Sequence, residues 1–165
     1  MEDIDINGAS SVLLTPAGHK RLKEELHHLT VNKRAEIAER IRESKDHGEY
    51  SEDNSELDEI KQEQAIVEAR IAELKTIFSN ADIIEESNIP TDEVGFGSKV
   101  TVRDEERSIE FSVRIVSSVE ANPDEDHISE ESPMGQALLG KKVGDTATYN
   151  APAGEITYKI VKIGV

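Results

Sequence analysis

The sequence predicts an α+β protein with an N-terminal antiparallel two-helix coiled-coil hairpin, followed by a small antiparallel sheet domain with one short helix. Three observations support this fold class. Apolar residues recur every three to four positions as far as Phe78, which is the helical period. From Phe96 onward they alternate with polar residues, as half-buried strands do. A short turn around Gly48 separates two helical stretches, which must therefore be antiparallel neighbours.

The first helix is expected to begin at Thr15, whose side chain caps it, with Pro16 in its first turn. Lys33 interrupts its apolar stripe, so the packing is expected to be loosest there. That stripe consists of Leu22, Leu26, Leu29, Ile37 and Ile41. The second helix carries a heptad seam with one polar member: Leu57, Ile60, Gln64, Val67, Ile71, Leu74 and Phe78. With about 30 residues per arm, the hairpin should project roughly 45 Å.

The second half of the chain reads as strands around one short helix, which Ser132 caps, Pro133 opens and Gly140 ends. The alternating apolar residues are Val100, Val102, Ile109, Phe111, Val113, Ile115, Ile156, Tyr158 and Ile160. The predicted organisation is an N-terminal tail (1–14), the hairpin (15–78) with an acidic tip (46–59), a linker (79–92) and the sheet domain (93–165).

Composition limits the possible classes of protein. The 165 residues include no cysteine, which excludes disulfides and thiolate zinc sites and favours a reducing, cytoplasmic location. No apolar run approaches the roughly 20 residues that a membrane span needs. Acidic residues near the N-terminus argue against a secretory signal. The net charge of -16 argues against a protein that wraps DNA with its whole surface.

Charge is unevenly distributed along the hairpin. Residues 15–45 carry eight Lys or Arg and five Glu, whereas residues 46–59 carry seven acids and no Lys or Arg. Carboxylates are the ligands that Mg²⁺ favours, so the tip could complete a metal site whose other ligands belong to a partner. The alternative is a solvated, charge-rich turn without a function. A long hairpin that presents its acids at the far end favours the first interpretation.

The basic side chains that lead to the tip are candidates for guiding a single-stranded RNA backbone. They are Lys33, Arg34, Arg40, Arg42 and Lys45. The alternative is ordinary pairing within the helix to Glu36, Glu39 and Glu43. No aromatic residues lie between them to stack on bases, so tight independent RNA binding is not expected. No phosphate loop, serine elbow or His-x-x-x-His pair is present, so self-contained catalysis is not expected either.

Several segments resemble the Gre transcript-cleavage factors of bacteria. In the hairpin these are Leu14–Gly18, Leu22–Leu26, His47–Glu52 and Phe78–Ala81. In the second domain they are Phe96–Val102, Ser132–Asp145 and Ala151–Glu155. The resemblance covers most of the chain, and Ser132–Asp145 is its most specific part. It implies a coiled-coil hairpin and a C-terminal domain with an FK506-binding-protein-like fold.

The resemblance also implies a function: a monomeric accessory factor that activates cleavage of backtracked RNA by RNA polymerase. Glu131, Ser132 and Pro133 match the motif that grips the secondary-channel rim on the largest subunit. Glu49 and Glu52 match the acidic tip residues that help to hold Mg²⁺ in the polymerase active site, and the isolated protein is expected to bind no cofactor. The basic residues Lys33, Arg34 and Lys45 match the patch that steers the 3′ end of the nascent RNA.

Two departures from the family pattern lie in the tip. Glu49 replaces the family's usual aspartate, and the segment that follows Glu52 is one residue longer than the family pattern. One inserted residue turns a helix by about 100°, so Asp53 is an alternative to Glu52. Some relatives inhibit polymerase without stimulating cleavage, so a channel-blocking regulator is the second hypothesis. A coiled-coil adaptor unrelated to polymerase is the third.

Overall fold

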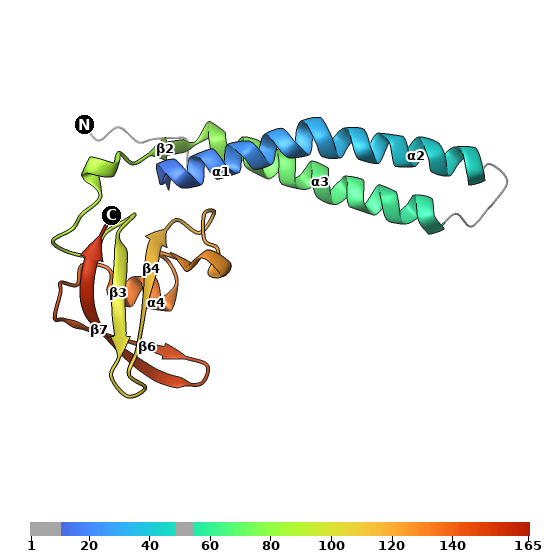
Figure 1. The fold of residues 1–165 in the computed structure, drawn as a ribbon. Helices are drawn as coiled ribbons and strands as arrows, with labels where there is room; N and C mark the ends of the chain where they lie inside the picture. The colour runs from blue at the N-terminus through green and yellow to red at the C-terminus, as the bar shows by residue number, and fades with distance from the viewer. Residues whose placement is uncertain (1–10, 49–54) are drawn as a thin grey trace, which may run out of the picture. The chain divides into compact units, whose positions relative to one another are not determined.

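The computed structural model describes residues 11–48 and 55–165 (Figure 1). Their contacts divide the chain into two compact units. Among the described residues, the first combines 11–18 with 81–165, and the second combines 19–48 with 55–80. In the described ranges, no helix is both long and apolar enough to cross a bilayer.

The helical unit is a two-armed hairpin. Its first arm runs through α1 (Pro16–His27), a π-helical segment (His28–Lys33) and α2 (Arg34–Gly48). The second arm is the single helix α3 (Ser55–Ser79), which packs along α2 (Figure 1). At 1.5 Å per residue, the 25 residues of α3 extend about 38 Å.

An apolar seam holds the two arms together. Its buried members are Ile37 on the first arm and Ile60, Val67 and Ile71 on the second, with Leu26, Leu29 and Ile41 packed against them. The predicted polar member, Gln64, is exposed. At the last position Ile77 is buried in place of Phe78, whose ring packs edge-on against His19 at 5.3 Å.

The π-helical segment lies where the stripe was predicted to be loosest. None of its residues is buried, and it ends at Lys33. A π turn takes up one residue more than an α turn, which brings Leu29 and Ile37 onto the same seam although they lie eight residues apart. The predicted interruption at Lys33 therefore coincides with a local change in helix type.

The other unit, called the sheet unit below, has as its main sheet, among the described residues, five strands in the order β5-β4-β3-β7-β6. They are β3 (Lys99–Asp104), β4 (Ile109–Val116), β5 (His127–Ser129), β6 (Thr146–Ala151) and β7 (Gly154–Gly164). Neighbouring strands are antiparallel except β4 and β5, which are parallel, so the sheet is mixed. The predicted fold class, a helical hairpin followed by a small sheet domain with a short helix, is confirmed.

One face of the sheet packs against the short helix α4 (Pro133–Leu138), which lies behind the strands in Figure 1. The buried core there contains Val100, Val102, Val113, Ile115, Ile160 and Leu138. These strand residues alternate as predicted, with one shift where a bulge in β7 falls between the partners of Thr101 and Val102. Ile109, at the start of β4, is exposed.

A two-stranded parallel sheet joins segments far apart in the sequence. In β1 (Val12–Leu14), predicted as part of the tail, Val12 is paired with Ala81 and Leu14 with Ile83 of β2 (Ala81–Ile83). A 3-10 turn (Glu86–Asn88) follows in the chain, and a second one (Pro123–Glu125) precedes β5.

Candidate functional site

The predicted tip residues Glu49, Glu52 and Asp53 lie outside the described residues. On either side of them, α2 ends at Gly48 and α3 begins at Ser55. Glu56 and Asp58 occupy the first turn of α3 and are exposed, where negative charge complements the helix dipole. Within residues 11–48 and 55–165, no cluster of three or more His, Asp or Glu side chains could hold a metal ion.

Two of the predicted RNA-steering residues form ion pairs with the opposite arm of the hairpin. Lys33 Nζ lies 3.0 Å from Glu63 Oε1, and Arg34 donates two hydrogen bonds of 2.8 Å to the carboxylate of Glu68. Arg40 Nη1 approaches the other oxygen of Glu63 at 2.6 Å. The positive charges of Lys33 and Arg34 are therefore balanced by glutamates of α3.

Glu63 is the centre of this group because it binds two cations. The hydrogen bond from Arg40, followed by the one from Lys33, holds the pKa of Glu63 below its ordinary value. In return, the hydrogen bond to Glu63 raises the pKa of Lys33. Pairing within the first arm also occurs, between Lys33 and Glu36 at 3.6 Å. Lys45, the third predicted residue, is exposed in the last turns of α2.

The predicted gripping motif forms the start of α4. Ser132 caps this helix: its Oγ accepts a 3.0 Å bond from Gly135 N–H and donates a 2.6 Å bond to the carbonyl of Ser129. Pro133 follows in the first turn, as predicted. Glu131 and Pro133 are exposed, so a rigid cap presents both side chains to solvent.

The sequence matches two family models that together span most of the chain. Residues 12–83 match "Transcription elongation factor, N-terminal", and residues 89–164 match "Transcription elongation factor, GreA/GreB, C-term". The chain belongs to the GreA/GreB family. The resemblance seen in the sequence is thereby confirmed, and the protein is a Gre-type transcription elongation factor, an accessory factor by family.

Individual relatives agree with the family. Transcription elongation factor GreA of Caldanaerobacter subterraneus subsp. tengcongensis is 50% identical over 152 residues, which covers 92% of this chain and 96% of the relative. GreA of Clostridium acetobutylicum is 48% identical, with 92% and 95% covered. Among solved structures, GreA factor homolog 1 (Gfh1) of Thermus thermophilus is 36% identical, with 94% and 99% covered and a TM-score of 0.44.

Sequence reasoning missed a buried carboxylate in this Gre factor. Glu120 is 1% exposed and accepts hydrogen bonds from both Thr15 N–H, at 3.0 Å, and Thr15 Oγ1. Thr15 Oγ1 in turn accepts a 3.1 Å bond from Gly18 N–H, which confirms the predicted cap of α1. The only local signal is Gly18, which lets the carboxylate approach the helix closely. Nothing in the sequence near Glu120 indicates its partner 105 residues away.

Proposed function

We propose that this protein binds RNA polymerase, inserts its hairpin into the secondary channel and stimulates the polymerase's own cleavage of backtracked RNA. Membership of the GreA/GreB family carries this proposal. The hairpin adds physical support, because a slender pair of helices can reach a buried active site that a globular domain cannot enter.

The proposed task of the tip is to supply carboxylate oxygens. Glu49 and Glu52 would hold a Mg²⁺ ion jointly with the polymerase, with Asp53 as the alternative to Glu52. Mg²⁺ favours oxygen ligands and often takes only one or two carboxylates from one source. When bound, the ion activates water for attack on a phosphodiester.

The basic residues are proposed to contact the extruded RNA. For Lys33 and Arg34 this contact means exchanging a glutamate for an RNA phosphate, because both side chains are paired with α3. Solvent-exposed ion pairs contribute little net stability, so the exchange costs little free energy. Lys45 is the member nearest to the tip and would meet the RNA closest to the cleavage site.

The start of α4 is proposed as the contact with the rim of the channel. Glu131 and Pro133 project from a backbone that the Ser132 cap holds in place. A preformed cap loses little conformational entropy when it binds, which favours docking by this segment.

The experiment is a cleavage assay on stalled, backtracked polymerase complexes. With Mg²⁺ and this protein, short 3′ RNA fragments should be released. The double variant Glu49→Ala/Glu52→Ala should abolish release while still binding polymerase. A control with the same change in charge is Glu105→Ala/Glu106→Ala, which alters two exposed acids in the turn between β3 and β4 and should cleave normally. Undiminished cleavage by the tip variant would reject the assignment.

A second function is tested by the same assay. The longer side chain of Glu49 and the extra residue after Glu52 favour a regulator that occupies the channel without stimulating cleavage. In that case the wild-type protein would slow nucleotide addition and release no fragments.

A further inference from the structure

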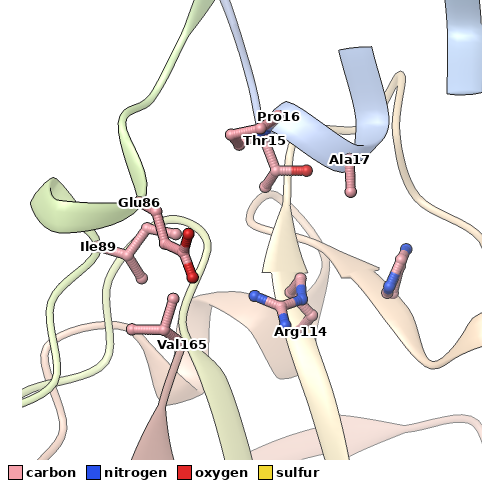
Figure 2. Close-up of a pocket in the computed structure, with 8 residues that line it drawn as sticks. Thr15, Pro16, Ala17, Glu86, Ile89, Arg114 and Val165 are labelled. Carbon is pink, nitrogen blue, oxygen red and sulfur yellow. The ribbon is translucent and has the colours of Figure 1, made fainter. Parts of the chain in front are cut away.

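A hollow of about 380 Å³ lies within the sheet unit, and none of the residues that line it belongs to the gripping motif Glu131–Pro133. Its walls come from residues 15–17, the 3-10 turn at Glu86, Ile89, the strand residue Arg114, His127 and Val165 (Figure 2). All of these belong to the same compact unit. Small-molecule sites typically enclose about 300 to 1,000 Å³, so this hollow is large enough for a small metabolite.

Two opposite charges line the hollow without pairing. Figure 2 shows the guanidinium of Arg114 and the carboxylate of Glu86 pointing into the space between them. Arg114 Nη1 donates a 2.7 Å bond to the carbonyl of Gly97, which orients the guanidinium, and in the described part of the chain no carboxylate forms an ion pair with it. The carboxylate of Glu86 likewise has no partner among the described residues.

The remaining walls offer one more polar atom and several apolar surfaces. His127 Nδ1 is buried and makes no hydrogen bond in the described structure, although Glu125 Oε2 lies 3.7 Å away. Ile89 is 7% exposed and lies with Val165 on the Glu86 side of the hollow in Figure 2, while Pro16 and Ala17 belong to the start of α1. The hollow therefore combines one cation, one anion and an apolar lining.

We propose that this hollow binds a free α-amino acid with an apolar side chain. Its carboxylate would pair with Arg114, its ammonium group with Glu86, and its side chain would pack on Ile89 and Val165. Charge balance selects this class of ligand. A phosphate or simple carboxylate would satisfy Arg114 but would leave Glu86 unpaired and repelled, whereas an amine alone would do the reverse. A bidentate carboxylate also matches the planar fork of a guanidinium.

The test is an NMR titration of the ¹⁵N-labelled full chain with L-leucine. Saturable shifts are expected for the backbone amides of Ala17, Ile89, Arg114 and Val165. Two analogues each remove one charge: 4-methylpentanoate lacks the ammonium group and 3-methylbutylamine lacks the carboxylate. Each should bind at least about tenfold more weakly, as expected when a charged group of the site is left unpaired.

Variants locate the site. Glu86→Gln changes an exposed residue on a short turn, and Arg114→Gln removes the cation. Each should weaken leucine binding by about tenfold or more. The matched control is Arg103→Gln on β3, because Arg103 is engaged by Glu110 at 2.8 Å and does not line the hollow; its affinity should be unchanged.

The proposal would be overturned by shifts that do not saturate with leucine, by equal binding of leucine and 4-methylpentanoate, or by unaltered binding by Glu86→Gln. Stronger shifts with inorganic phosphate than with leucine would also overturn it and would identify a simple anion site. Because Glu86→Gln leaves the Arg114–Gly97 bond intact, a folding defect in Arg114→Gln does not weaken the test.

Discussion

Replacing Gly18 by alanine should destabilise the protein, although the same change usually stabilises a helix. A methyl group at this position would lie within 2.5 Å of the carboxylate carbon and both oxygens of Glu120. Glu120 is fully buried, and Thr15, which donates two hydrogen bonds to it, is 4% exposed. The added methyl must therefore displace the carboxylate and break these bonds.

The expected magnitude follows from the bonds that are lost. A hydrogen bond to a charged group contributes about 1.5 to 3 kcal/mol, so losing both costs about 3 to 6 kcal/mol. Replacing a helical glycine by alanine by itself stabilises the helix by about 1 kcal/mol. The net loss in the free energy of unfolding should be about 2 to 5 kcal/mol. With a urea m-value of about 2 kcal/mol/M, the midpoint would fall by about 1 to 2.5 M.

Urea unfolding followed by circular dichroism measures this loss, and hydrogen exchange at the Thr15 amide locates it. The control is Gly164→Ala in β7, where the added methyl meets nothing within 4 Å and the stability should change by less than about 1 kcal/mol. A Gly18→Ala protein as stable as wild type, with the Thr15 amide still protected, would refute the role given to Glu120.

Three further predictions concern other contacts. Gly135→Ala should destabilise the sheet unit by about 3 kcal/mol or more, because its methyl would overlap the Ser129 carbonyl; melting curves compared with those of Gly164→Ala test this. The Glu63 ion pairs should stabilise the hairpin at pH values above the ordinary pKa of glutamate, and this stabilisation should be lost as the pH falls through the lowered pKa of Glu63. The urea midpoint of Glu63→Gln should therefore differ from that of the wild type at pH 7, and the two midpoints should converge at low pH. Raising NaCl from 0.1 to about 1 M should shrink the difference at pH 7, whereas an unchanged difference would argue against exposed ion pairs.

Local periodicity explains why most elements could be predicted from the sequence. Ile60, Val67 and Ile71 recur at the helical spacing and are buried in the hairpin seam, and Val113 and Ile115 alternate and are buried under α4. The cap formed by Ser132 and Pro133 is equally local, because its hydrogen bonds join residues at most four positions apart. Each of these features depends on neighbours in the chain.

The candidate site was less predictable because its contacts are not local. For the basic side chains that lead to the tip, the local alternative was pairing with Glu36, Glu39 or Glu43. Lys33 and Arg34 instead pair mainly with glutamates of α3 that lie 30 and 34 residues further along the chain. Which glutamate of α3 faces each basic residue depends on the register of the two arms, and the π-helical segment changes that register. The roles of Glu49, Glu52 and Asp53 stay predictions, since these residues lie outside the described ranges.

The sequence by itself determined the class of fold, the family, the two arms of the hairpin, α4 and the strands β3, β4 and β7, because helix caps, turns and the periods 3.6 and 2 are written into short stretches of chain. Only the tertiary structure decided that the Glu120 carboxylate accepts hydrogen bonds from Thr15, that β1 pairs with β2, and that Arg114 and Glu86 line one hollow. These contacts join residues that neither periodicity nor capping relates, so they arise only when the folded backbone brings distant segments together.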